Sequence, residues 1–245
     1  MLDLVRPAIH MTWRDLCFLH WRADAAALAA RLPEGLEVEE FDGSAWVGVV
    51  PFEMRGTRAA PLPAVPGLRH FPELNLRTYV RHRDRPGVWF FSLDASSPLI
   101  VRVARATFAL PYLDAQMSLA REPGGWIRYE SRRRDALGAP PAAFSARYRP
   151  IGDPAPSAPG TLEHFLTERY SLFSRRGFGV PRSLRGGLLR GDIEHDPWPL
   201  QPAEVVLERN DMFRIAGLGV PSEPPLAHYA TDLRVRAQPP RRVAP

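Results

Sequence analysis

The sequence predicts a mainly β or α+β protein in which antiparallel pairing dominates. Short segments with apolar or alternating character recur along the whole chain, turn residues separate most of them, and helical segments are few. No internal repeat is present, so we expect residues 1–245 to form a single domain. Residues 151–160, rich in proline, glycine and serine, are the one linker candidate.

Strand signals are runs of aromatic and branched residues bounded by turn residues. They predict strands over residues 13–21, 36–41, 44–54, 74–81, 88–93, 113–121, 126–132, 143–149, 187–195, 204–210 and 228–236. Asp42-Gly43 and Arg85-Pro86-Gly87 mark hairpin turns. Residues 56–72 are rich in proline and glycine and are expected to form an ordered loop or lid.

Three segments have helical character, and each has a suitable residue at its start. The predicted helices cover residues 25–32 after Asp24, residues 98–108 from Pro98, and residues 161–170 from Thr161. Arg102 and Arg105 lie three positions apart on one face of the second helix.

The chain contains no lysine, because all 32 of its Lys+Arg positions are arginine. Arginine stays protonated, with a pKa above about 12, and cannot supply the neutral amine that a Schiff base needs. Pyridoxal enzymes, lysine-dependent aldolases and decarboxylases, P-loop NTPases and protein kinases are therefore excluded.

Charge and cysteine content limit which binding partners and which cellular compartment we expect for the protein. The formal net charge is +5, but the arginines are dispersed among 27 acidic residues, so no nucleic-acid partner is expected. Cys17 is the single cysteine, which excludes an intrachain disulfide and fits a reducing compartment. No run reaches the ~18–20 apolar residues of a membrane span, and the N-terminus lacks the apolar segment of a signal peptide. We therefore expect a cytoplasmic protein without a membrane partner.

The common motifs for nucleophiles, nucleotides and metals are absent from the sequence. The cluster Asp192-Ile193-Glu194-His195-Asp196 has the right residue types for a metal. On a strand, however, its three carboxylates face one side and His195 the other. We therefore expect neither a metal nor a cofactor.

Polar residues inside apolar strands are the best candidates for a site. Glu73, Asn75 and Arg77 share one face of a predicted strand, Asp94 ends another apolar strand, and Arg14 lies in the aromatic N-terminal strand. Inside a cavity, an arginine would hold a carboxylate or enolate oxygen. A carboxyl group with a raised pKa would serve as general acid or base. Surface charges on outward-facing strands remain the alternative for each of these residues.

Several long strings resemble one family. They are Trp13-Arg14-Asp15-Leu16, Leu32-Pro33-Glu34-Gly35-Leu36, residues 41–52, 71–80, 87–95 and 162–170, and Pro197-Trp198-Pro199-Leu200-Gln201-Pro202-Ala203. In this order they resemble the YqjF-like proteins of unknown function, which are placed in the acetoacetate decarboxylase-like superfamily. The resemblance covers residues 10 to 242 approximately. It implies an acetoacetate decarboxylase-like antiparallel β-barrel with a few flanking helices around an internal pocket.

The same resemblance carries two expectations about site residues. In true decarboxylases an arginine at the position of Arg14 lines the active site, and a lysine from a segment near residues 100–106 forms the Schiff base. This chain has Arg102 and Arg105 in that segment and no lysine. Decarboxylation through an imine is therefore excluded on chemical grounds.

We expect an internal pocket that binds a small carboxylate- or carbonyl-containing metabolite. Glu73 and Asp94 are the candidate catalytic residues, and the candidate substrate-binding residues are Arg14, Asn75, Arg77, Arg102, Arg105 and Tyr112. If the protein is an enzyme, its chemistry is cofactor-independent acid–base catalysis of the lyase or isomerase type. The alternatives are a non-catalytic ligand sensor or partner-binding protein and, less favoured, an arginine-based nucleic-acid binder. The oligomeric state, including a homo-oligomer, stays open.

Overall fold

The computed structural model describes residues 9–59, 70–134, 140–175 and 186–243. Most of these residues lie in strands. The strands are β1 (Ile9–Arg14), β2 (Leu16–Ala23), β3 (Glu37–Val38), β4 (Glu40–Phe41), β5 (Ser44–Ala59), β6 (His70–His82), β7 (Arg85–Ala95), β8 (Tyr112–Arg121), β9 (Ile127–Arg133), β10 (Ala143–Pro150), β11 (Ser171–Arg175), β12 (Leu188–Glu194), β13 (Leu200–Asn210), β14 (Leu226–Ala230), β15 (Leu233–Ala237) and β16 (Arg241–Arg242).

The helices are few and short, as predicted. They are α1 (Ala25–Ala29), α2 (Pro98–Phe108), the 3₁₀ turn η1 (Pro123–Gly125), α3 (Leu162–Thr167) and α4 (Met212–Ile215). The Asp24 side chain accepts a hydrogen bond from the amide of Ala27, and Thr161 accepts one from His164, so both predicted N-caps are confirmed. Among the described residues, no helix has the length and apolar composition needed to span a membrane.

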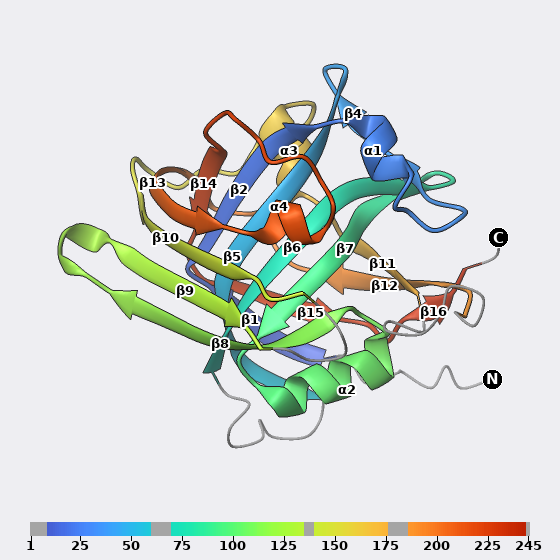
Figure 1. Ribbon diagram of the computed structural model, residues 1–245, viewed down its shortest axis with the longest axis horizontal. Coiled ribbons are helices and arrows are strands. Elements are labelled where there is room, and N and C mark those ends of the chain that lie inside the picture. The colour runs from blue at the N-terminus through green and yellow to red at the C-terminus, as the bar shows by residue number, and fades with distance from the viewer. Residues whose placement is uncertain (1–8, 60–69, 135–139, 176–185, 244–245) are drawn as a thin grey trace.

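The strands form one sheet that closes on itself (Figure 1). One closed circuit of paired strands consists of β1, β5, β6, β7, β11, β12 and β15, and we call it the cavity ring. The second circuit consists of β2, β5, β6, β7, β8, β9, β10, β13 and β14, and we call it the packed ring. The two rings share β5, β6 and β7, so each of these strands presents one face to each ring.

The pairing is mixed, because β7 runs parallel to both β8 and β11. The other ladders are antiparallel, which confirms the predicted class. At the parallel contact Gly87 lies against β11 so closely that a Cβ there would meet the carbonyl oxygen of Ser171 at 2.6 Å. Glycine is required at this crossing because the two backbones leave no room for a side chain.

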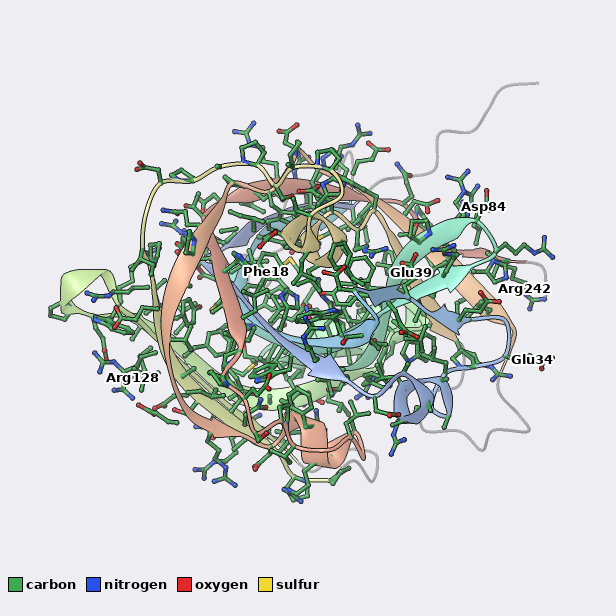
Figure 2. The ribbon with its side chains drawn as sticks, turned by 90° about the horizontal axis from the view of Figure 1, so that it is seen from above. Phe18, Glu34, Glu39, Asp84, Arg128 and Arg242 are labelled. Atoms are coloured by element: carbon green, nitrogen blue, oxygen red, sulfur yellow. The ribbon has the colours of Figure 1, made fainter. Side chains whose placement is uncertain are left out.

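The packed ring contains a continuous hydrophobic core. Its buried residues include Cys17, Leu19, Trp21, Val47, Val49, Leu74, Leu76, Tyr129, Phe144 and Tyr148, with α4 contributing Met212 and Phe213. Figure 2 shows Phe18, on the opposite face of β2, among the side chains of the interior, whereas Asp84, Arg128 and Arg242 lie at the periphery. The alternation along β2, β5 and β6 therefore separates two interiors.

Several boundaries differ from the sequence prediction. The Asp42-Gly43 turn is confirmed, with φ values of 49° and 69°, but the second hairpin turns at Arg83-Asp84 and β7 already begins at Arg85. The predicted loop over 56–72 is shortened, because β5 continues to Ala59 and β6 begins at His70. Residues 60–69 of that loop lie outside the described residues. The segment 151–160, proposed as a linker, makes a bridge to β13 through Ala155 and Leu200.

Candidate functional site

A cavity of about 170 Å³ lies inside the cavity ring. Its walls come from β1, β5, β6, β7, β11, β12 and β15, and α2 covers it with Ile100, Val103, Ala104, Thr107 and Phe108. In Figure 1 this helix crosses the lower end of the sheet. Most of the lining is apolar, as in typical small-molecule sites, where a few polar groups orient the ligand.

Glu73 is a buried carboxyl group in the cavity wall. Its side chain is 2% exposed, and Oε2 accepts a hydrogen bond of 2.9 Å from the Tyr112 hydroxyl. Burial raises the pKa of Glu73 from 4.5 to about 8; the charge of Asp94 contributes in the same direction, and the Tyr112 hydrogen bond opposes it. At neutral pH this carboxyl is therefore largely protonated, and a modest change in surroundings can release its proton.

Arg77 is a buried guanidinium in the same wall. It is 8% exposed and donates to the carbonyl oxygen of Leu166 at 3.1 Å, and its Cζ lies 5.4 Å from the centroid of the Phe18 ring. Its Nε has no hydrogen-bond partner, and no carboxylate of the described residues pairs with it. A buried cation without a counter-ion is costly, so an anion that enters the cavity would stabilise it.

Asn75 lies between Glu73 and Arg77 on β6, and its Oδ1 is buried without a partner. Residues 73 and 77 lie on one face of β6, about 13 Å apart along the extended strand. The predicted residues Glu73, Asn75, Arg77 and Tyr112 therefore all line one cavity. The alternative of outward surface charges is wrong for the three β6 residues.

Arg14 lies outside the cavity, contrary to the expectation. Its guanidinium is 31% exposed and lies 3.3 Å from Asp232 and 3.5 Å from Asp15. The cause is local: Asp15 has a φ of 53°, which divides the predicted N-terminal strand into β1 and β2. This break reverses the alternation, so Trp13 before it and Leu16 after it line the cavity, while Arg14 faces away.

Asp94 also lies outside the cavity, and its prediction as a catalytic residue is corrected. Both carboxylate oxygens accept hydrogen bonds from Arg133, at 2.8 to 3.2 Å, and both side chains are almost fully buried. A bulge explains this orientation, because Leu76 pairs with Ser92 but Arg77 pairs with Phe90. The extra residue of β7 turns Leu93 toward the cavity and Asp94 away from it.

The two arginines of α2 do not take the place of a lysine in the cavity. Arg102 is exposed, and Arg105 donates from Nε to the carbonyl oxygen of Tyr112 at 2.6 Å. The positions of α2 that line the cavity are apolar apart from Thr107. The predicted roles of Arg102 and Arg105 in substrate binding are therefore corrected: the helix closes the cavity but brings no charge to it.

Sequence reasoning missed several polar residues of the cavity, among them Trp13, His195 and Arg169. Trp13 and His195 line the cavity, and each has a buried ring nitrogen without a hydrogen-bond partner. Arg169 also lines it, but its guanidinium forms an ion pair with Glu39. Strand alternation in the sequence served only to separate His195 from the three carboxylates of residues 192–196, and it gave His195 no role. The other sequence signal for His195 was its position just before Pro197-Trp198-Pro199.

The acidic cluster near His195 forms ion pairs with neighbouring arginines. Asp192 lies 3.0 Å from both Arg190 and Arg241. Within the described residues, no three His, Cys, Asp or Glu side chains are grouped as metal ligands.

Comparisons with known proteins agree with this architecture. The family model DUF2071, described as an uncharacterized conserved protein, matches residues 10–234. The chain belongs to this family. A curated relative, the uncharacterized protein YqjF of Bacillus subtilis (strain 168), is 41% identical over 222 residues, which cover 91% of this chain and 87% of the relative.

Solved structures show the fold that the family shares. Acetoacetate decarboxylase from Legionella pneumophila is similar, with a TM-score of 0.65 and 17% identity, over 97% of this chain and 87% of that one. The enduracididine biosynthesis enzyme MppR complexed with pyruvate has a TM-score of 0.67 and 15% identity, over 99% of this chain and 92% of that one. At these identities the likeness establishes an acetoacetate decarboxylase-like fold and nothing of the chemistry.

Proposed function

We propose that the cavity binds a small metabolite with a carboxylate next to a carbonyl group, and that Glu73 exchanges a proton with the carbon beside that carbonyl. The observation that carries this proposal is the buried guanidinium of Arg77, which pairs with no carboxylate of the described residues and faces the same small cavity as Glu73. A cationic group and a carboxyl with a pKa of about 8 are suited to an anion that undergoes acid–base chemistry.

The size and lining of the cavity limit the ligand. A volume of about 170 Å³ is close to that of an engineered apolar cavity of about 150 Å³ that accepts benzene. The ligand is therefore a small acid with a short apolar tail. The fold neighbour MppR is described as complexed with pyruvate, a 2-oxo acid of this size class, which supports the choice of probes.

The proton transfer needs only residues of this chain. Ionised Glu73 removes a proton from the carbon beside the carbonyl, and the electrons of the C–H bond form an enolate while Glu73 becomes a neutral acid. Arg77 stabilises the negative charge of the carboxylate and enolate oxygens, and the Tyr112 hydroxyl holds the Glu73 carboxyl in place. Return of the proton to carbon restores the starting state. No Schiff base takes part, since the chain has no lysine.

The test is hydrogen–deuterium exchange at C3 of 2-oxobutanoate in D₂O, followed by ¹H NMR. We expect the wild-type protein to accelerate exchange, with a rate that rises with pH through about 8, because ionised Glu73 is the base. Glu73→Gln should abolish the acceleration, whereas Glu130→Gln, at a surface carboxylate of β9 that is 54% exposed, should not. Equal rates in wild type and Glu73→Gln would discard the catalytic role.

Binding is tested separately by calorimetry with the same acid. Arg77→Gln should weaken binding by about 100-fold, because a charge-assisted interaction in a dry site is lost. Arg102→Gln changes an arginine on the exposed face of α2 and serves as the control. Unchanged affinity in Arg77→Gln would contradict the proposed function. Binding without exchange in the wild type would instead support a ligand sensor.

A further inference from the structure

His195 brings an unpartnered hydrogen-bond acceptor to the cavity. Nδ1 lies 2.7 Å from the carbonyl oxygen of Asp196. A carbonyl oxygen only accepts, so Nδ1 carries the proton and donates it. Nε2 is then unprotonated, and it is buried without a partner. Burial lowers the pKa of His195, and the charge of Arg77 contributes to this, so the ring is neutral at physiological pH.

The ring of His195 is held in place on several sides. It stacks on Tyr170 at 4.6 Å and lies 5.2 Å from Trp198. Trp198 lies 4.9 Å from Phe18, which in turn contacts the Arg77 guanidinium. Both His195 and Arg77 line the cavity, the aromatic rings of Trp198 and Phe18 connect them, and the charge of Arg77 acts on His195.

Trp13 adds a donor to the same cavity lining. Its ring stacks on Trp198 at 5.7 Å, and its Nε1 is buried without a partner. The Nε1 of Trp198, by contrast, already donates to the carbonyl oxygen of Thr167. These residues thus offer two donor groups, Arg77 and Trp13, and one acceptor, the Nε2 of His195.

We propose that His195 is a specificity-determining residue whose Nε2 accepts a hydrogen bond from a hydroxyl group adjacent to the carboxylate of the ligand. The inference rests on the proposed function, in which Arg77 binds that carboxylate. A 2-hydroxy acid, or the enol of a 2-oxo acid, has the required O–H. The carbonyl oxygen of a 2-oxo acid has only lone pairs and would face the lone pair of Nε2.

The consequence is a preference for the hydroxy form over the oxo form of one carbon skeleton. Glu73 takes the proton from carbon and, as a neutral acid, passes it to the enolate oxygen. The enol that results donates its O–H to Nε2, which the ketone does not do. Binding that is stronger to a reaction intermediate than to the substrate is what accelerates a reaction. A stable 2-hydroxy acid reproduces the hydroxyl of that enol and is therefore the best probe of this position.

The experiment measures the affinities of 2-hydroxy-4-methylpentanoate, 4-methyl-2-oxopentanoate and 4-methylpentanoate by calorimetry. We expect the wild type to bind one enantiomer of the hydroxy acid at least about tenfold more tightly than the other two acids, a ratio typical of one good hydrogen bond. His195→Phe retains a ring for stacking but has no acceptor. It should lose the preference and bind 4-methylpentanoate with unchanged affinity.

A second variant covers the case in which the phenylalanine variant does not fold. The amide of His195→Gln both donates and accepts, so it should remove the preference by improving the binding of the oxo acid. His70→Phe is the matched control, since His70 is exposed at the start of β6 and lines neither the cavity nor the surface groove beside His195. A tenfold preference that survives both His195 variants would overturn the inference.

The outcomes separate this inference from the proposed function. If Arg77→Gln weakens all three acids while the His195 variants keep the wild-type preference, the carboxylate site stands and the role of His195 is wrong. If none of the three acids binds to the wild type, or if Arg77→Gln leaves all affinities unchanged, the proposed function itself fails, and the role of His195 fails with it.

Discussion

The packed ring and the cavity ring share β5, β6 and β7 but have different interiors. In the packed ring, Leu74 and Leu76 of β6 contact a continuous core of aliphatic and aromatic side chains. In the cavity ring, Glu73 and Arg77 of the same strand face an open cavity. One strand therefore contributes to stability with one face and to the candidate site with the other, since successive side chains point in opposite directions.

The two rings also differ in whether their buried charged side chains have a counter-ion. Asp94, on the packed side, is neutralised by Arg133 through several hydrogen bonds. Arg77, on the cavity side, has no such partner in the part of the chain that the structure describes. A protein tolerates an uncompensated buried charge when function requires it. Four experiments test whether the two rings differ in this way.

The largest expected effect is the loss of the buried ion pair. Asp94→Ala leaves the Arg133 guanidinium, 2% exposed, without its counter-ion. We expect a loss of about 3–5 kcal/mol of unfolding free energy in urea titrations. Glu204→Ala breaks the exposed ion pair with Arg149 and should cost less than about 1 kcal/mol. Similar losses in both variants would contradict the structural role assigned to Asp94.

The next largest effect is a difference in unfolding free energy between substitutions on the two faces of β6. Leu74→Ala creates a void in the packed core and should destabilise the protein by about 2–5 kcal/mol. Asn75→Ala, at the adjacent position, removes a side chain that faces the cavity and should cost less than about 1 kcal/mol. Equal losses of unfolding free energy would show that the cavity side is packed as tightly as the core.

A pH-dependent effect is expected at Glu73. Its pKa is about 8 in the folded protein, above the ordinary value of 4.5. The folded protein therefore keeps a proton that the unfolded chain releases between these values, and the stability of the wild type falls as pH rises through this window. Glu73→Gln removes this dependence, so its unfolding free energy relative to wild type should rise by up to about 4 kcal/mol between pH 5 and pH 9.

The measurement is the difference in Tm between Glu73→Gln and wild type from pH 5 to pH 9. The difference should grow with pH and be smallest at pH 5, where Glu73 is protonated in the folded protein. A difference that is constant over this range would mean that Glu73 is not the group that holds the proton.

The smallest effect on stability is expected from filling the cavity. Ala104 lies on the face of α2 that closes it, and Ala104→Leu adds volume there. We expect a change of less than about 1 kcal/mol in unfolding free energy, because empty space is available. The affinity for 4-methyl-2-oxopentanoate should nevertheless fall more than about tenfold. Unchanged affinity would place the binding site elsewhere.

The sequence was sufficient for features that depend on local patterns. Alternation along β6 placed Glu73, Asn75 and Arg77 on one face, and the caps of α1 and α3 were evident from Asp24 and Thr161. The absence of lysine was also decided by the sequence alone. These features require only a period of two or a residue type at a helix end.

Tertiary structure decided which ionisable groups face the cavity. The positive φ of Asp15 moved Arg14 outward, and one extra residue in β7 moved Asp94 away. The pairing of β12 with β11 and β15 brought His195 to the cavity from a distant part of the chain. A shift by one residue reverses every later side chain of a strand, and such shifts are set by pairing with distant partners. For this reason the residue types of the site could be found in the sequence, but their convergence could not.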